Sequence, residues 1–365
     1  MTLDQRSELA RGYMLMGVFY LHVLFAMLKV VPDPMAVPAA LIQVKLLAGH
    51  VSVFFFLSGM GASGLKRRSA QSVAIQSVTL LALAALSHLG GVLISAIIYG
   101  LPESWRDLFR VLVRPIVYGT GYSTFVAWFF IVLSVVRPLA WLFERNRLRF
   151  LIAVVAITLL ILIGQWLHLP HNLYEWRNWP FALLFFMIGM HVPRRRQVPA
   201  WLGVGGLAAS LAAAWLNGPD IMATGLCWTC NIEFLPFPMV GAQGFLPLAL
   251  ASEIAFLLFL LWVSQLRFIP HIPWAIQWFG RASTQFLLLH GWMIAALWPM
   301  LTNFFPFPAG VYPYLLVLIL NPTAHAAAYL ALKPLLNHML AFCFGLSRWL
   351  VEMLRRLVHR TRHRK

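Results

Sequence analysis

Acidic residues are scarce in this sequence. There are 11 Asp and Glu against 28 Lys and Arg, which gives a formal net charge of +17. Charged residues make up 11% of the 365 positions, whereas 61% are apolar. A soluble domain of this size could not bury so much apolar surface, but lipid can solvate it. The composition therefore predicts an all-α polytopic membrane protein.

The excess of basic residues does not indicate a nucleic-acid partner. Basic residues lie in short runs between apolar segments, which is typical of cytoplasmic loops that fix membrane topology. A nucleic-acid site needs a basic and aromatic surface outside the membrane. None is expected here, so this class of partner is excluded.

Cysteine is also scarce. Cys227 and Cys230 form a Cys-x-x-Cys pair, and Cys343 stands alone. Two cysteines with no histidine near them in the sequence cannot complete a four-ligand zinc site, and we predict no metal. If their loop faces an oxidising compartment, the pair is expected to form a local disulfide; a redox role is the alternative.

The common fingerprints of nucleotide and hydrolase sites are missing. The sequence has no Walker motif, no Gly-x-Gly-x-x-Gly after a strand, no His-Glu-x-x-His and no Gly-x-Ser-x-Gly. ATP-driven transport and serine-hydrolase chemistry therefore have no support.

Ten stretches read as membrane-spanning helices, at about 20 apolar residues per crossing. They lie near residues 11–30, 46–65, 73–98, 121–142, 150–168, 179–193, 199–216, 244–266, 281–302 and 312–332. Because the connections are short, residues 1–332 are expected to form one membrane domain.

Basic residues also predict the orientation. Runs that recur after alternate crossings are Lys66 to Arg68, Arg145 to Arg149, Arg194 to Arg196 and the tail from Arg355. With both termini and these loops in the cytoplasm, 22 of the 28 Lys and Arg lie inside, as the positive-inside rule requires. Residues 333–365 are then a cytoplasmic amphipathic helix, near 334–354, and a basic tail. An eleventh span over 334–354 is the alternative.

Arg11 and His22 are eleven residues apart in the first apolar segment. Eleven steps turn an α-helix almost a whole number of times, so both side chains share one face, roughly 16 Å apart along the axis. The pair places a cation near one membrane surface and an imidazole near the bilayer centre. Ionisable groups at that depth are costly in lipid and usually mark a site.

Few other ionisable residues fall inside the predicted spans. They are His88, Glu253, His290 and His325, with Arg137 and Arg281 nearer the inner surface. A histidine there can act as a general base near neutral pH, and Glu253 is a candidate to orient one of them. The alternative is that Glu253 is protonated, or bonded to Ser or Thr of a neighbouring helix.

An outer loop at 99–120 carries Arg106, Arg110 and Arg114, spaced four residues apart. This spacing predicts one shared helical face. The face is expected either to anchor lipid headgroups or to bind an acidic glycan or a carrier phosphate.

Several segments resemble the membrane-bound acyltransferase 3 family. Arg11-x10-His22 is similar to its first-helix motif, and Val53-Phe-Phe-Phe-Leu-Ser-Gly59 to its Phe-rich second-helix motif. Further similar segments are Trp128-Phe129, Phe181 to Met190, and Gly280-Arg281-Ala282-Ser283-Thr284 running into Leu288-Leu289-His290. The resemblance covers most of the chain.

The resemblance implies a multi-pass enzyme of the bacterial inner membrane, an O-acyltransferase. Such an enzyme moves a small acyl group, commonly acetyl from cytoplasmic acetyl-CoA, to a sugar hydroxyl of a surface or periplasmic glycan. The implied catalytic group is His22, with Glu253 and His290 as further candidates. The candidates for binding the donor phosphates are Arg11, Lys66, Arg67, Arg68 and Arg281. Expected partners are acyl-CoA, the glycan, membrane lipids and other proteins of polysaccharide synthesis or export.

The sequence departs from the family pattern at three places. Met60 stands where the family often has tyrosine, Phe286 replaces a tyrosine, and the run after Arg68 lacks further arginines. Part of the donor-phosphate site is therefore replaced, or the donor differs from acetyl-CoA, with succinyl as the alternative acyl group.

Two other functions are compatible with the sequence. A transporter could move a small solute or protons through the Arg, His and Glu groups, as in other bundles with ionisable residues at the midplane. A non-catalytic subunit of a polysaccharide export complex is the second, although it leaves the buried charges without a role.

Overall fold

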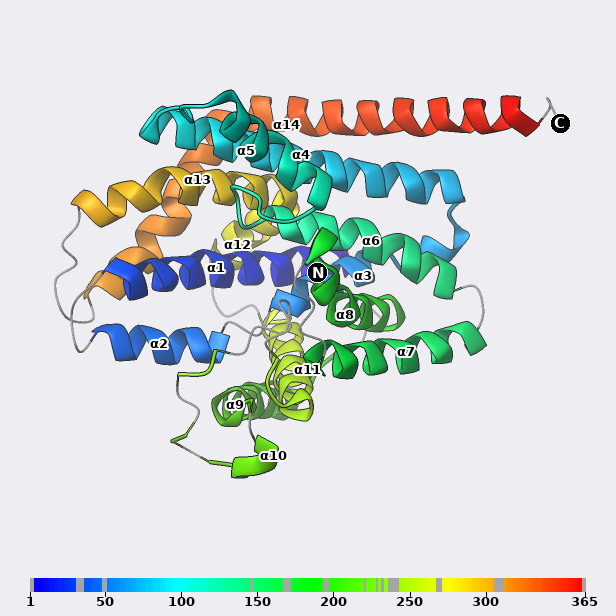
Figure 1. Ribbon diagram of the computed structural model, residues 1–365. Helices are drawn as coiled ribbons and strands as arrows, with labels where there is room; N and C mark the ends of the chain where they lie inside the picture. The colour runs from blue at the N-terminus through cyan, green and yellow to red at the C-terminus, as the bar shows by residue number, and fades with distance from the viewer. Residues whose placement is uncertain are drawn as a thin grey trace.

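The chain folds into a bundle of helices (Figure 1). The computed structural model describes residues 3–30, 36–47, 51–144, 147–166, 172–192, 197–219, 221–227, 229–230, 233–235, 243–266, 271–304 and 312–362. These residues contain helices and no strand, so the predicted all-α class is confirmed.

Helices form at each of the ten predicted spans. The elements are α1 (Leu3–Val30), α2 (Ala36–Leu47), α3 (Ser52–Gly61), η2 (Leu65–Arg67), α4 (Ala70–Tyr99), α5 (Trp105–Tyr118), α6 (Ala127–Phe143), α7 (Arg147–Trp166), η3 (Leu173–Asn178), α8 (Trp179–His191), α9 (Ala200–Leu216), α10 (Ile221–Thr224), α11 (Leu246–Val263), α12 (His271–Arg281), α13 (Ser283–Phe304) and α14 (Tyr312–Arg362). The short amphipathic helix α12 was not predicted.

Four segments of the described chain are long and apolar enough to cross a membrane. They are Ala40–Gly61, Ala70–Tyr99, Leu246–Val263 and Ile319–Val358. Their length and composition are those of membrane-protein helices.

Glycines let the central helices approach closely. A Cβ at Gly59 of α3 would overlap the Phe186 carbonyl oxygen of α8, and a Cβ at Gly189 would overlap the Phe56 carbonyl oxygen in return. Small residues permit such backbone contact between helices. Both glycines belong to motifs that carry the family resemblance, so these motifs have a packing role here.

The same arrangement joins α1 to α12. A Cβ at Gly12 would overlap the carbonyl oxygen of Ile276, and one at Gly280 would overlap that of Glu8. Gly12 and Gly280 directly adjoin Arg11 and Arg281 in the sequence. The crossing therefore fixes the backbone positions of two predicted donor-site arginines.

The C-terminal region differs from the prediction. A separate surface helix over 334–354 was expected, but α14 continues through this region as one helix with Pro322 and Pro334 inside it. Figure 1 shows that α14 bends between its orange start and its long red end. Proline removes one backbone hydrogen bond and kinks a helix without necessarily ending it.

Contacts with the bundle hold the continued helix in place. The side chains of Leu336 and Ser347 are buried, and Arg355 bonds to Gln71 of α4 over 3.0 Å. The predicted boundary at residue 333 thus falls inside α14.

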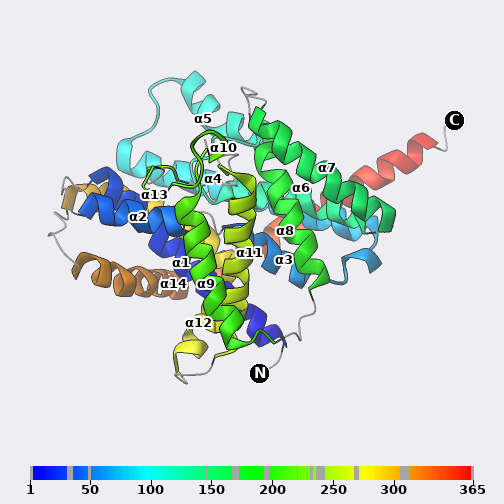
Figure 2. The ribbon, with the colours of Figure 1, turned by 90° about the horizontal axis from the view of Figure 1, so that it is seen from below.

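The two ends of the bundle differ. In Figure 2 the N-terminal end of α1 and helix α12 lie at one end, whereas α5 and α10 lie at the opposite end. Helices α9 and α11 run side by side between them. The first turns of α1 and helix α12, joined by the Arg281–Glu8 ion pair, therefore belong to one end, and α5 belongs to the other.

Candidate functional site

Three histidines from three helices form a hydrogen-bonded chain inside the bundle. His290 Nε2 lies 3.1 Å from His22 Nδ1, and His290 Nδ1 lies 2.8 Å from His325 Nε2. The rings come from α1, α13 and α14. His290 and His325 are fully buried, whereas His22 is half-buried. Sequence reasoning selected His22 and His290, and the structure brings them together.

Backbone carbonyls at both ends of the three-histidine chain show which ring nitrogens carry a proton. His325 Nδ1 lies 2.8 Å from the Asn321 carbonyl oxygen, and His22 Nδ1 lies 2.8 Å from that of Val18. A carbonyl oxygen can only accept, so both Nδ1 atoms carry hydrogen in the neutral rings. His325 Nε2 then accepts from His290 Nδ1, and His290 Nε2 accepts from His22 Nδ1.

This assignment leaves His22 Nε2 without a proton. Among the described residues, no hydrogen-bond partner contacts that nitrogen, since both contacts of His22 are made through Nδ1. An unprotonated imidazole nitrogen on a half-buried ring is the form that a general base requires. The other two rings supply what a third group supplies in a catalytic triad, a fixed tautomer and orientation.

Aromatic rings surround the three-histidine chain and fix its geometry. Phe19 stacks on His325 with ring centroids 3.9 Å apart, and Phe125 lies 3.9 Å from His22. Phe125 belongs to the loop before α6, not to a helix. His22 is therefore covered on one side by a loop residue.

Glu253 does not orient a histidine. Its Oε2 accepts a hydrogen bond from Ser52 Oγ of α3, and its buried Oε1 has no partner among the described residues. The sequence left open a bond to Ser or Thr of a neighbouring helix, and that alternative is confirmed. Helix α11 contacts both α1 and α3, but the Glu253 carboxylate bonds to Ser52 of α3 and not to His22 of α1.

An arginine cluster lies near the N-terminal end of α1. Arg11 donates to the Leu57 carbonyl oxygen over 3.4 Å, and the positive charges of Arg11 and Arg68 both act on Arg137 of α6. Arg137 Nε is buried with no hydrogen-bond partner among the described residues. Like charges held together raise the free energy unless an anion joins them, so this cluster is a candidate anion site.

The other predicted donor-site residues lie differently. Arg281 is paired with Glu8 over 2.9 Å, so its charge is locally balanced. Lys66 and Arg67 are exposed, as is Arg68 of the cluster. Arg145 and Arg194 to Arg196 lie outside the described residues.

His325 and Arg137 belong to the histidine chain and the arginine cluster, although the sequence alone predicts no role for either. His325 was one of several ionisable residues inside the predicted spans, and Arg137 was placed near the inner surface. The only sequence feature that pointed to these two residues was their position inside the predicted membrane spans. Nothing in the sequence indicated that His325 reaches the same point as His290, since 35 residues separate them.

The cysteine pair forms the expected local disulfide, between Cys227 and Cys230, and Cys343 is buried and free. Comparison of the chain with models of known protein families, with curated proteins and with solved structures found no match.

Proposed function

We propose that this protein is a membrane-bound O-acyltransferase. It moves a small acyl group, acetyl in the first instance, from a cytoplasmic acyl-CoA to a sugar hydroxyl of a glycan on the far side of a bacterial inner membrane. The observation that carries the proposal is the three-imidazole chain, because it leaves the half-buried Nε2 of His22 ready to accept a proton.

His22 is the only group that takes up and releases a proton in the proposed acyl transfer. His22 Nε2 takes the proton of the sugar hydroxyl while the sugar oxygen attacks the thioester carbonyl carbon. The tetrahedral intermediate collapses, the carbon–sulfur bond breaks, and the leaving thiolate takes the proton back from His22. The products are the O-acyl sugar and free CoA. Hydrogen bonds through His290 to His325 spread the transient positive charge over three rings.

The arginine cluster supports the donor end of the proposal. Guanidinium groups bind phosphate oxygens through paired, charge-assisted hydrogen bonds. Arg11, Arg68 and Arg137 would hold the CoA phosphates, with the thioester arm directed along α1 toward His22.

The path between the two ends is closed in the structure. Leu15 and Val18 lie on the Arg11–His22 face of α1 and are buried, with 0% and 8% of their surface exposed. The proposal therefore requires these side chains to move aside when the donor binds. Met14 beside them, also buried, is a flexible side chain that can repack around such an arm.

The test compares three forms of the protein in cells and after purification. Mass analysis of surface carbohydrate is expected to show one added acyl unit with the wild-type protein and none with His22→Ala. Release of free CoA by the purified variant should fall by about 10²–10⁴-fold, the contribution of a positioned general base. His338→Ala is the matched control, because His338 is exposed and, among the described residues, bonds only to the Pro334 carbonyl of its own helix. Full acylation by His22→Ala would contradict the proposal.

Proton transport is the second candidate, since a chain of hydrogen-bonded imidazoles can also pass protons along its length. Liposomes that contain the protein and a trapped pH indicator separate the two. Proton flux that is lost in His290→Ala, without any release of CoA from acetyl-CoA, would favour transport over acyl transfer.

A further inference from the structure

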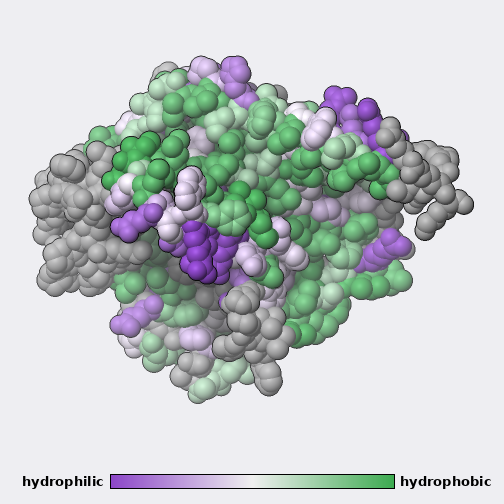
Figure 3. Space-filling view, turned by 45° about the horizontal axis from the view of Figure 1, so that its top comes forward, coloured by the Kyte–Doolittle hydropathy of each residue, from purple (hydrophilic) through white to green (hydrophobic). Residues whose placement is uncertain are grey.

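A cavity of about 740 Å³ opens at the end of the bundle that carries α5. Its lining comes from α4, α5, the loop before α6 and the start of η3, and it includes His88, Arg110, Arg114, Tyr118, Ser123 and Asn172. None of its described lining residues is acidic. Figure 3 looks onto the top and front of the bundle, where hydrophilic residues gather at a hollow within a largely hydrophobic surface.

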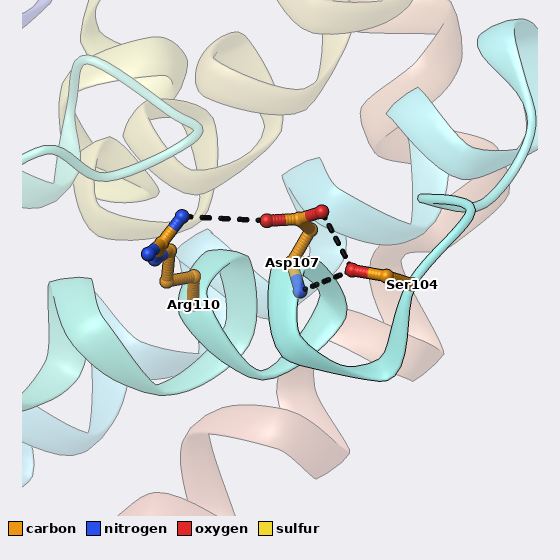
Figure 4. Close-up of polar contacts among 3 residues, drawn as sticks. All are labelled: Ser104, Asp107 and Arg110. Atoms are coloured by element: carbon orange, nitrogen blue, oxygen red, sulfur yellow. Dashed lines mark hydrogen bonds and ion pairs between the residues drawn. The ribbon is translucent and has the colours of Figure 1, made fainter.

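The two arginines of the cavity are held in different ways. Ser104 caps α5 by accepting from the Asp107 backbone N–H over 3.1 Å, and it also donates to the Asp107 carboxylate over 2.6 Å. Asp107 in turn lies 3.4 Å from Arg110 (Figure 4). Arg114 has no carboxylate partner among the described residues, and its guanidinium lies 5.7 Å from the centre of the Tyr118 ring. The cavity thus keeps one uncompensated positive charge beside an aromatic face.

The opposite stripe of α5 has a different character. Trp105, Phe109 and Ile116 recur at helical spacing and are exposed, as expected for a helix that lies against lipid. Arg106 does not line the cavity. The α5 arginines were predicted to serve one purpose, either a headgroup anchor or an anion site, but the structure separates Arg106 from the two that face the cavity.

Residues with rare backbone angles lie at the rim of the cavity. Tyr174 and Glu175, directly after the lining residues of η3, both have positive φ angles of 50° and 57°. Non-glycine residues rarely adopt such angles, and they cluster at functional sites. Burial raises the pKa of the Glu175 carboxyl, which accepts a hydrogen bond from Asn172 over 2.5 Å. The rim is therefore preformed without a ligand.

The loop that lines the cavity also contacts His22. His88 Nδ1 accepts from the Ser123 backbone N–H over 3.0 Å, and His88 Nε2 lies 2.9 Å from the Val111 carbonyl oxygen. Ser123 therefore joins the cavity to the loop that carries Phe125, the ring in contact with His22. Gly91 and Gly291 allow this loop to pass close to α4 and α13, because a Cβ at either would press on Thr124.

We propose that this cavity binds an anionic saccharide, with its acidic group between Arg110 and Arg114 and a sugar face against Tyr118. A concave site with a few convergent polar groups and an aromatic wall fits a sugar, and an uncompensated guanidinium selects an acidic one. The inference rests on the proposed function, since the saccharide is the acceptor of the acyl group. A membrane headgroup is the competing ligand, and the cavity disfavours it because the lipid-facing stripe of α5 lies on the other side of the helix.

Binding is measured without any acyl donor, on the full-length protein in nanodiscs of zwitterionic phosphatidylcholine. The probes are trigalacturonate, which is acidic, and maltotriose, which is a neutral sugar of the same length. We expect trigalacturonate to bind more tightly than maltotriose. Arg114→Gln should weaken its binding by about tenfold or more, the usual effect of losing one hydrogen bond to a charged group. Arg106→Gln is the matched control and should change the affinity by less than about twofold.

Three results would overturn the proposal. The first is equal binding of both probes by the wild-type protein. The second is an equal loss in Arg114→Gln and Arg106→Gln, which would indicate general charge attraction. The third is loss of trigalacturonate binding when phosphatidylglycerol is added, which would assign the arginines to lipid headgroups.

If Arg114→Gln does not fold, Arg114→Lys and Tyr118→Leu replace it, and normal binding by both would overturn the proposal. Because no donor is present, these results are independent of whether acyl transfer occurs.

Discussion

At the scale of single residues, two backbone carbonyls decide which nitrogen of the histidine chain is basic. The Val18 and Asn321 carbonyls hold one proton each at the two ends, and the remaining proton positions follow. A carboxylate partner, as in a Ser-His-Asp triad, would add a negative charge inside the bundle. The imidazole chain performs the same orientation without a buried charge, which suits a site in lipid.

Glu253 provides the residue-scale prediction. Glu253→Gln keeps an oxygen that can accept from Ser52 and does not touch the histidine chain. We expect acyl transfer within about twofold of wild type, and thermal stability at least as high, because the substitution removes a buried ionisable group that has one unpartnered oxygen. Initial rates of CoA release and thermal unfolding in detergent measure both.

His290→Gln is the comparison for this experiment, since it breaks the imidazole chain while also placing an amide in the core. Its transfer rate should fall by at least about 10²-fold. An equal fall in Glu253→Gln would show that Glu253 acts in the chemistry.

At the scale of helices, glycine pairs decide how the site is assembled. The α3–α8 crossing at Gly59 and Gly189, and the α1–α12 crossing at Gly12 and Gly280, bring backbones into contact. Close approach lets carbonyl oxygens and short side chains meet over a wide area, where larger residues would hold the helices apart. Three of these four glycines lie within or beside the segments that also supply Arg11, Arg281 and the second-helix motif.

Gly59→Ala is the prediction at this scale. The added methyl group would overlap the Phe186 carbonyl oxygen, so the helices must shift, which costs about 1–3 kcal/mol in a packed core. Thermal unfolding in detergent should show a lower midpoint than that of the wild-type protein.

Gly205→Ala is the control for this substitution. Gly205 is also in a helix, α9, but nothing lies within 4 Å of a Cβ placed there. Alanine should stabilise that helix by roughly 0.5–1 kcal/mol relative to glycine. A Gly59 variant that behaves like the Gly205 variant would contradict the proposed backbone contact.

At the scale of the whole molecule, the proposal assigns different ligands to the two ends of the bundle. The end with the N-terminus and α12 lies opposite the end with α5. Arg11 of α1 and Arg68 act on Arg137, and the cavity with Arg110 and Arg114 is lined by α5. The histidine chain lies between them. Transfer from a cytoplasmic donor to an external acceptor requires this polarity, with the first end in the cytoplasm.

The orientation is tested with single cysteines at two capping serines. Ser69 and Ser104 are exposed and precede α4 and α5, so α4 lies between them. In a Cys343→Ser background, Ser104→Cys should react with a membrane-impermeant maleimide on spheroplasts. Ser69→Cys should react only after the membrane is opened. Labelling of both cysteines on intact spheroplasts would contradict a crossing by α4.

The sequence alone determined the helical class, the positions of the apolar helices and the residues worth attention inside them. Apolar runs and helical spacing are local properties, so the Arg11–His22 face and the helix that carries the α5 arginines could be predicted directly. The pairing of Cys227 with Cys230 was accessible for the same reason, since the two are three residues apart.

Only the tertiary structure decided which of these residues meet. His290 and His325 are 35 residues apart, and His22 lies 268 residues from His290, so no local pattern could join them or show that Glu253 pairs with Ser52 instead. The continuation of α14 past Pro334 was likewise settled by its packing against α4, because contacts with a neighbouring helix can outweigh a helix-breaking residue. Local patterns specify elements, whereas the site depends on how distant helices cross.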